Sequence, residues 1–437
     1  MNSFRELSLK RVISWAQEFM VGGSWAITYM EEIRRNLRWF WIDGVFSAAS
    51  DSIPITYFTL YLVALGASDK QVGIYSSLTN LAGALFLFPG VMLVERFGHR
   101  HGLTVLFGGV VGRIFLLGCA LLPFWFTGTQ LIWVLIVFAV ARSIAGNLAF
   151  PAWMSLTADI VPLAGRGRYF GVRGFAATLA TIIAVFVTGK LITHLGAPQG
   201  YQWVLLLAFI LGLISTFGFA KIRDPRPDHR ATTVLTPRSI FEDLSASPLF
   251  VALCSAAALW SFSINIAGPF YSVYMANSLG FTAAMIGNVT IISSVFRLLT
   301  QRKAGELADR LGPRAIQVAT MFLIPLLSLA WAFLTSYYQA LVVNMFSGVL
   351  WGAFELVSFN VLLEMLPVER QARYSAIYQV VVMLSYSLGA MTGAYIIGSV
   401  GYRGVFLATT IGRWMAAILL AFFLYSFRKK HVAKEIA

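Results

Sequence analysis

The sequence predicts an all-α membrane protein in which twelve transmembrane helices form two pseudo-symmetric six-helix bundles. Three observations lead to this fold class. The 437 residues are 58% hydrophobic and 12% charged, with a mean hydropathy of +0.75, whereas about 25% of the residues in soluble domains are charged. Twelve apolar runs are long enough to cross a bilayer core of about 30 Å as helices. Short motifs of the first half recur in the second half.

The twelve apolar runs define the predicted helices. They cover residues 39–65, 70–94, 102–126, 130–158, 168–192, 200–221, 248–276, 282–301, 315–335, 338–365, 374–398 and 402–427. A polar stretch with several prolines separates the sixth run from the seventh, as expected of a linker. The predicted domains are an N-terminal bundle (39–222), a cytoplasmic linker (223–247), a C-terminal bundle (248–427) and a cytoplasmic tail (428–437).

Residues 1–38 precede the first run and are amphipathic. We expect them to form a helix on the inner leaflet, with Trp15, Phe19, Trp25 and Tyr29 as interfacial anchors. A disordered tail is the alternative.

The internal repeat supports two related bundles. An acid, two apolar residues and a proline, followed six residues later by Arg-Tyr, occur at 159–169 and again at 364–374. A second motif, at 95–100, recurs at 309–314. Because six runs lie in each half, both halves have the same orientation and are parallel repeats about an axis along the membrane normal. Duplicated membrane chains of this kind are typical of transporters, with the substrate path between the repeats.

The net charge of +14 arises from Lys and Arg that lie mostly in the predicted cytoplasmic segments. This bias follows the positive-inside rule and places both termini in the cytoplasm. We therefore expect an integral protein of the plasma (inner) membrane, whose excess charge also attracts anionic membrane lipid. The same distribution argues against nucleic acid as a partner.

Catalytic and metal-binding patterns are missing from the sequence. The two cysteines, Cys119 and Cys254, lie in separate apolar runs, and the five histidines are scattered. There is no phosphate-binding Walker A motif. We expect a chain that is not an enzyme, with no catalytic residues, no metal and no cofactor.

The loop after the eighth run carries a family resemblance. Residues 305–314 read GELADRLGPR, and this resembles the G-x-x-x-D-R-x-G-R/K-R loop of the major facilitator superfamily, with Pro313 in place of a basic residue. The loop after the second run is a less regular copy. The resemblance implies the twelve-helix fold of that family, transport by alternating access, and a central cavity lined by the first, fourth, seventh and tenth helices. The fifth run lacks the Gly-Pro motif that drug–proton antiporters of the family usually carry, which disfavours that class.

Charged residues at the inner ends of the helices are predicted to form a cytoplasmic gate. Acid–base pairs and contacts with helix termini there can latch the two halves together. The resemblance implies such a role for Asp309, Arg310 and Arg314. The full predicted set is Gly305, Asp309, Arg310, Arg314, Glu95, Arg96, Arg100, Asp159, Arg168, Glu364 and Arg373. The alternative is that these charges only fix the topology.

Two acids lie near the middle of the membrane. Asp51 is twelve residues beyond Trp39, which is about 18 Å along a helix, and Glu355 is at a similar depth in the tenth run. An ionisable group at this depth is costly, and it therefore suggests a functional site. We expect Asp51 and Glu355 to take up a proton or contact the substrate, and a fixed ion pair with an arginine is the alternative. Asp43, nearer the inner interface, is expected to be hydrated.

Arginines and amides complete the predicted site. Arg142 is the candidate for holding an anionic group of the substrate, and Asn147, Asn265 and Asn360 are predicted substrate contacts. Arg173 and Arg297 lie close enough to the inner ends of their helices to snorkel. For Arg113 and Arg413, pairing with a buried acid, a lipid headgroup and a subunit contact all remain open.

These observations predict a secondary transporter that moves a small organic solute or amphiphile by alternating access, coupled to protons and acting as a monomer. Import and export are both compatible with the sequence. The alternative is a non-transporting protein of the same fold, such as an assembly factor, a receptor or a lipid-handling protein.

Overall fold

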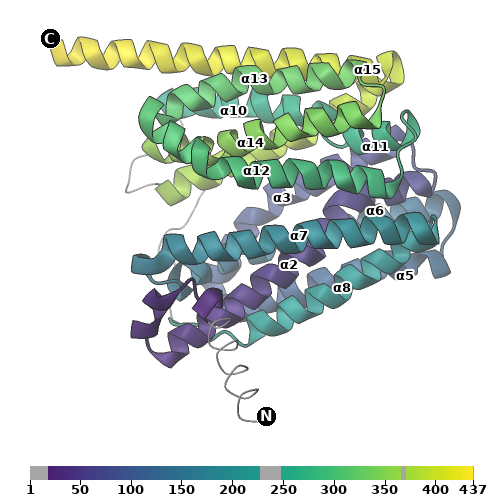
Figure 1. Ribbon diagram of the computed structural model, residues 1–437, viewed down its shortest axis with the longest axis horizontal. Helices are drawn as coiled ribbons and strands as arrows, with labels where there is room; N and C mark the ends of the chain where they lie inside the picture. Colours follow the sequence, from purple (N-terminus) through teal and green to yellow (C-terminus); the bar gives the residue numbers. More distant parts are fainter. Residues whose placement is uncertain (1–17, 227–247, 366–370, 437) are drawn as a thin grey trace, which may run out of the picture. The chain divides into compact units, whose positions relative to one another are not determined.

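The structure is a computed structural model that describes residues 18–226, 248–365 and 371–436. Every regular element within these residues is a helix (Figure 1). The first half contains η1 (Ser24–Thr28), α2 (Glu31–Ala64), α3 (Asp69–Phe97), α4 (Arg100–Leu103), the π-helical turn η2 (Thr104–Val111), α5 (Gly112–Leu121), η3 (Leu122–Phe124), α6 (Gly128–Ile160), η4 (Leu163–Gly165), α7 (Arg166–Leu195) and α8 (Gln199–Ala220). The second half contains α10 (Pro248–Ala267), α11 (Phe270–Asn277), α12 (Ala283–Leu311), α13 (Pro313–Phe333), α14 (Tyr337–Met365) and α15 (Gln371–Ile436).

The number of membrane-crossing helices is consistent with the twelve predicted. Within the described residues, ten helical segments are long and apolar enough to span a bilayer. One of them, 374–423, consists of two helices joined at Gly401, whose φ of 71° lies in the left-handed region that glycine adopts readily. The ten do not include α2, which is 34 residues long but carries several charged residues.

The described residues form two compact units. The first comprises 18–58, 86–127 and 137–226, and the second comprises 59–85, 128–136, 248–365 and 371–436. In the first unit, α8 packs against α5 and α7. In the second, α10 packs on α15, α12 on α14, and α13 on both α14 and α15 (Figure 1).

The segment before α2 is built into the core of the first unit. Val21 and Ala26 are buried in the same cluster as Leu37 and Tyr169. The ring of Trp25 covers Gly165, where any added Cβ would overlap it. Val21, Trp25 and Ala26 therefore pack on protein, so Trp25 does not project as an anchor. Residues 31–38 belong to α2. Trp15 lies outside the described residues.

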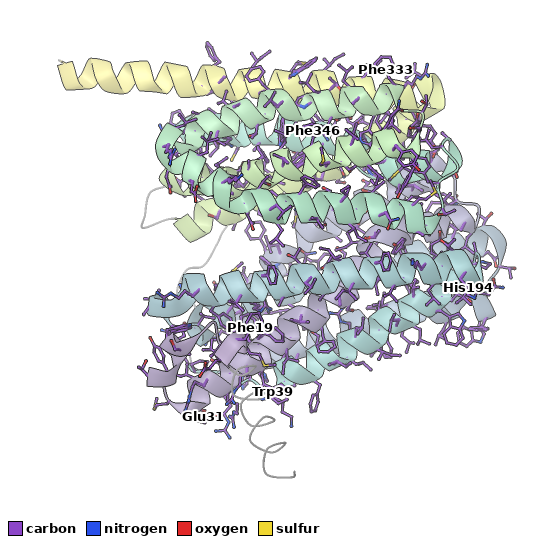
Figure 2. All side chains as sticks on the ribbon, in the orientation of Figure 1. Phe19, Glu31, Trp39, His194, Phe333 and Phe346 are labelled. Atoms are coloured by element: carbon purple, nitrogen blue, oxygen red, sulfur yellow. The ribbon has the colours of Figure 1, made fainter. Side chains whose placement is uncertain are left out.

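Large apolar side chains cover the outside of the helices. Phe333 on α13 and Phe346 on α14 are 66% and 52% exposed, and Figure 2 shows such side chains along the helices of both units. An aqueous protein rarely exposes so much contiguous apolar surface. A surface of this kind matches the hydrocarbon core of a membrane.

Close packing between α10 and α15 depends on two glycines. The sequence motif Gly389-x-x-x-Gly393 predicts such packing. A Cβ on Gly393 would overlap the carbonyl oxygen of Ile266, and a Cβ on Gly389 would overlap that of Phe262. These are backbone atoms of α10, so the helices would have to separate.

Replacing Gly393 with alanine is expected to destabilise the protein by about 1–3 kcal/mol, the usual cost of overpacking. Thermal unfolding of the purified variant in detergent measures this loss. Gly398, on the same helix, is the matched control because an added Cβ there would meet nothing within 4 Å. Alanine favours a helix over glycine by about 1 kcal/mol, so Gly398→Ala should leave stability unchanged or raise it. Equal losses in both variants would contradict the packing argument.

Candidate functional site

A cavity of about 470 Å³ lies in the first unit. It is bordered by α2, by η2 with α5, and by α6, α7 and α8. Its volume is in the range of about 300–1,000 Å³ that is usual for small-molecule sites. Charged, polar and aromatic side chains lie together along its wall, among them Asp43, Ser47, Asp51, Arg113, Arg142, Ser143, Asn147, Phe150, Trp153, Arg173, Ser215, Thr216 and Phe219.

Helix geometry brings the polar residues of α2 to this cavity. Asp43, Ser47, Asp51 and Ile55 follow one another at intervals of four residues, and all four line it. Residues four apart share one face of an α-helix. Consequently α2 presents one continuous polar stripe to the cavity, ending in Ile55.

Asp51 is held between two arginines. Its Oδ1 accepts hydrogen bonds from Arg113 Nη1 and Arg142 Nη2, each at 2.6 Å. The Ser47 hydroxyl donates to Asp51 Oδ2 at 3.1 Å, and Arg113 Nη1 also donates to Ser50 Oγ at 3.1 Å. The cluster therefore combines one carboxylate with two guanidinium groups from α5 and α6.

The three charged groups differ in their access to the cavity. The side chain of Arg113 is 7% exposed, whereas those of Arg142 and Asp51 are 28% and 35% exposed. A buried charge is tolerated when it is paired, and leaving it unpaired is costly. Arg113 is thus a fixed cation that depends on Asp51, while Asp51 and Arg142 are accessible from the cavity.

A second ion pair lies on the same face of α2. Arg173 Nη2 lies 3.3 Å from Asp43 Oδ2, and the Ser215 hydroxyl donates to Asp43 Oδ1 at 2.7 Å. The Arg173 guanidinium also lies over the Phe40 ring, 4.1 Å from its centroid. The expectation that Asp43 is hydrated is wrong, because the residue is 7% exposed and its carboxylate is paired. Arg173 likewise pairs within the protein instead of snorkelling.

The predicted gate residues Arg100 and Asp159 meet at the end of α6. Arg100 Nη1 donates to Asp159 Oδ2 at 2.7 Å, and Arg100 Nη2 donates to Asp224 Oδ1 at 2.6 Å. Ser155 Oγ accepts from Arg100 at 2.9 Å, and Arg226 also pairs with Asp159. The Arg100 side chain is 1% exposed. This cluster joins the start of α4, the end of α6 and the segment after α8, all within the first unit.

The other predicted gate residues lie mostly at exposed positions. Glu95 is partly buried, with one carboxylate oxygen that has no hydrogen-bond partner among the described residues. Exposed positions are held by Arg96, Arg168, Asp309, Arg310 and Arg314, and Gly305 is half-buried. The side chains of Glu364 and Arg373 lie outside the described residues.

In the second unit, Glu355 pairs with Arg297 at 3.0 Å. Asn265 donates from Nδ2 to the Tyr386 carbonyl at 2.7 Å. The side chain of Asn360 lies outside the described residues. Glu355 and Asn265 are thus held by other contacts than those around Asp51.

The two unexplained arginines have different surroundings. Arg113 pairs with an acid, the half-buried Asp51, which comes nearest to the first of the three possibilities. Arg413, in the second unit, is 4% exposed and donates to Ser328 Oγ at 2.7 Å. Its guanidinium lies 5.7 Å from the centroid of the Trp351 ring, and it makes no ion pair with a carboxylate among the described residues.

Replacing Glu355 with glutamine is expected to change the free energy of unfolding by at most about 1 kcal/mol, because its pair with Arg297 leaves both side chains about half exposed and such pairs contribute little when they face water. The Glu355 and Arg297 side chains are 53% and 42% exposed. Thermal unfolding in detergent measures the change, with Arg297→Gln as the reciprocal variant. A loss of about 3 kcal/mol or more, as expected of a buried pair, would contradict this exposed geometry.

Sequence reasoning predicted Asp51, Arg142 and Asn147, which the structure places along one cavity, but it did not predict all of their contacts. Asn147 lines the cavity and donates from Nδ2 to the Ser143 carbonyl at 2.8 Å. The pairing of Arg113 with Asp51 was left open, and Asp224, a partner of Arg100, was assigned to the linker. One available signal was the four-residue spacing along α2, which groups Asp43 with Asp51.

Comparison with known proteins gives consistent matches along most of the chain. The family model described as Major Facilitator Superfamily matches residues 40–265 and 253–437. A protein of Streptococcus pneumoniae named multi-drug resistance efflux pump PmrA is 24% identical over 409 residues, which cover 92% of this chain and 98% of that protein. Multidrug resistance protein MdtG of Dickeya zeae is 25% identical over 384 residues, covering 86% of this chain and 91% of that protein.

Solved structures share the fold at low sequence identity. A point mutant of the nucleoside transporter NupG superposes with a TM-score of 0.73 at 12% identity, covering 89% of this chain and 99% of that chain. A D-xylose-proton symporter superposes with a TM-score of 0.67 at 16% identity, covering 88% and 96%.

Proposed function

Because this chain belongs to the Major Facilitator Superfamily, and is therefore an integral membrane protein and a secondary transporter, we propose that it moves a small organic solute through the cavity of the first unit and couples this movement to protons. The two sequence repeats, 39–222 and 248–427, act as the alternating halves. The plasma membrane is the site of action, with both termini in the cytoplasm, as the distribution of Lys and Arg predicts.

The observation that carries the proposal is the position of Asp51. Its carboxylate is 35% exposed, lies at the cavity wall and shares one oxygen between two arginines. A metal cation such as Na⁺ would be repelled by these arginines. Protonation needs no room beside them and removes the negative charge, so a proton suits this site better.

The two arginines also explain how proton binding can depend on the transport cycle. Close cations favour the ionised carboxylate, so Asp51 holds no proton readily while both Arg113 and Arg142 contact it. Drawing Arg142 away, by a solute or by movement of α6, removes part of that stabilisation. Proton affinity then changes between states, and a coupled carrier requires such a change.

The cavity wall supports an amphiphilic solute. Phe150, Trp153 and Phe219 provide aromatic surface, and Asn147 and Thr216 provide polar groups. The names of the relatives from S. pneumoniae and D. zeae, which describe multidrug resistance, agree with organic compounds of this kind as the cargo. Asn265, Glu355 and Asn360 stay predicted contributions of the second half.

Vesicles reconstituted with the purified protein test the proposal. An imposed pH gradient should drive accumulation of amphiphilic compounds from a test panel, and a trapped pH indicator should report proton movement with each compound. Protein-free vesicles are the control. Compound flux that ignores the pH gradient would contradict proton coupling. Tight lipid or partner binding with no flux of any compound would favour the non-transporting alternative.

A further inference from the structure

The cavity holds an excess of positive charge. Among the described residues, Asp43, Asp51, Arg113, Arg142 and Arg173 are the charged side chains that line it. Asp43 and Arg173 form a one-to-one pair. The excess therefore belongs to the cluster in which Asp51 faces both Arg113 and Arg142.

The arginines of this cluster have unused hydrogen-bond donors. A guanidinium group has five N–H donors. Arg142, which is 28% exposed, contacts Asp51 through Nη2. Arg113 Nε has no hydrogen-bond partner among the described residues, although the residue is only 6% exposed. Arg113 reaches both oxygens of Asp51, through Nη1 at 2.6 Å and Nη2 at 3.5 Å, whereas Arg142 contacts one oxygen through Nη2. Arginine commonly binds carboxylates through two parallel N–H bonds, so this capacity is largely free in Arg142.

We propose that this cavity binds an organic anion, a carboxylate on an aromatic or aliphatic body, and that proton uptake by Asp51 promotes its binding. The proposal rests on the proposed function and adds the charge class of the solute and the sign of the coupling. The anionic group lies against Arg142 and Arg113. The apolar body lies along Phe150, Trp153 and Phe219.

Proton uptake by Asp51 promotes anion binding because ionised Asp51 and the anion compete for the same N–H donors of Arg113 and Arg142. Ionised Asp51 occupies Arg113 and Arg142 and repels a second anion. When Asp51 takes a proton from the solution, both arginines lose their counter-charge, which is costly in a membrane-embedded site. A bound anion then replaces the negative charge that Asp51 lost on protonation. Thermodynamic linkage makes the effect reciprocal, so a bound anion raises the proton affinity of Asp51 by the same factor.

This sign fixes the relative direction of transport. A proton and an anion that favour each other in one cavity cross the membrane together. A cation would bind ionised Asp51, compete with the proton and be exchanged for it. The excess of arginine over aspartate in the cluster favours the first arrangement.

Three probes of matched shape test the charge class: naphthoate, naphthamide and naphthylmethylammonium. Their binding to the full-length protein in nanodiscs is measured by calorimetry at about pH 6 and about pH 8, where naphthoate stays ionised because unperturbed carboxyl pKa values lie near 4. We expect naphthoate to bind most tightly and at least about fivefold more tightly at the lower pH, the lower end of typical coupling. Wild-type protein in weakly buffered solution should take up protons as naphthoate binds. Preference for the ammonium probe, proton release, or no naphthoate binding at either pH would overturn the proposal.

Variants locate the effect. Asp51→Asn mimics the protonated acid, so at the higher pH it should bind naphthoate at least about fivefold more tightly than wild type and lose the pH dependence. Arg142→Gln should lose the preference for naphthoate. Asp43→Asn is the matched control, because it removes the same charge from the same helix face without freeing Arg142, and its gain should be smaller. An equal gain in both asparagine variants would overturn competition at the arginine pair.

A milder variant covers the case in which Asp51→Asn does not fold. The Ser47 hydroxyl donates to Asp51 Oδ2 at 3.1 Å, so Ser47→Ala weakens the ionised form and should move the pH dependence of naphthoate binding to higher pH. An unmoved pH dependence contradicts the role of Asp51. The anion proposal can fail while the proposed function holds. Proton-driven flux of another compound, without naphthoate binding, would contradict only the anion proposal.

Discussion

Replacing Asp51 with asparagine is expected to reduce proton-driven transport to the level of protein-free vesicles. The substitution removes the carboxyl group that takes up the proton, while the amide keeps nearly the same size and can still accept a hydrogen bond from Arg113 or Arg142. Exchange of labelled for unlabelled solute needs no net proton movement, so it should continue. Reconstituted vesicles with an imposed pH gradient, and the same vesicles without one, measure the two processes.

The two acids of α2 provide the critical comparison. Asp43 lies on the same face eight residues earlier and also lines the cavity, but its side chain is 9% exposed against 35% for Asp51. Proton-driven accumulation that persists in Asp51→Asn and disappears in Asp43→Asn would show that Asp43, and not Asp51, couples transport to protons. Loss of both accumulation and exchange in Asp51→Asn, with a correctly folded protein, would indicate that Asp51 only organises the site.

Replacing Arg100 with glutamine is expected to cost about 3–5 kcal/mol of stability, the loss typical when one partner of a buried ion pair is removed. Arg100 is 1% exposed and donates to both Asp159 and Asp224. Glutamine leaves these carboxylates facing each other with Arg226 as the remaining cation. Thermal unfolding in detergent, followed by tryptophan fluorescence, measures the loss.

Arg168 is a suitable control for that experiment. Arg168 lies in the first turn of α7, a few residues after Asp159. It is exposed and makes no ion pair among the described residues. Surface substitutions usually change stability by about 0.5 kcal/mol or less, so Arg168→Gln should behave as wild type. A small effect of Arg100→Gln, comparable to that of Arg168→Gln, would contradict the view that Arg100 holds the ends of α4 and α6 together.

The fold could be predicted because its signals are local. Apolar runs of the required length and the repeated motifs identify the helices and the family without any tertiary information. The boundaries were less accessible. The first helix begins at Glu31 rather than near Trp39, since the charged turns that precede the apolar run continue the helix into the inner interface. Trp25 looked like a membrane anchor because sequence does not show that Gly165 leaves space for its ring.

The candidate site could be predicted only in part, because it depends on which helix faces meet. Asp51 and Arg142 stood out as charges in apolar runs, and the structure brings them together. Their third partner, Arg113, carried the same signal, yet its direction around α5 could not be read from the sequence. Glu355 was predicted to belong to the same site, but its contacts lie elsewhere. It carried the same signal as Asp51 and lies in the second unit, paired with Arg297.

The cluster of Arg100, Asp159 and Asp224 could also not be predicted in full, because it depends on tertiary contacts. Arg100 and Asp159 were both expected at a cytoplasmic gate, and the structure pairs them with each other inside the first unit. Asp224 looked like part of a solvated linker because two prolines follow closely. Contact with a buried arginine 124 residues earlier in the chain overrides that local composition.

Infrared difference spectroscopy of the purified protein tests the central claim most directly, since a protonated carboxyl group has a C=O band that an ionised one lacks. Spectra recorded between neutral and acidic pH, with a transported solute present, should contain such a band in wild type and in Asp43→Asn, and the band should be missing in Asp51→Asn. A carboxyl band that survives unchanged in Asp51→Asn would show that the coupling proton binds elsewhere.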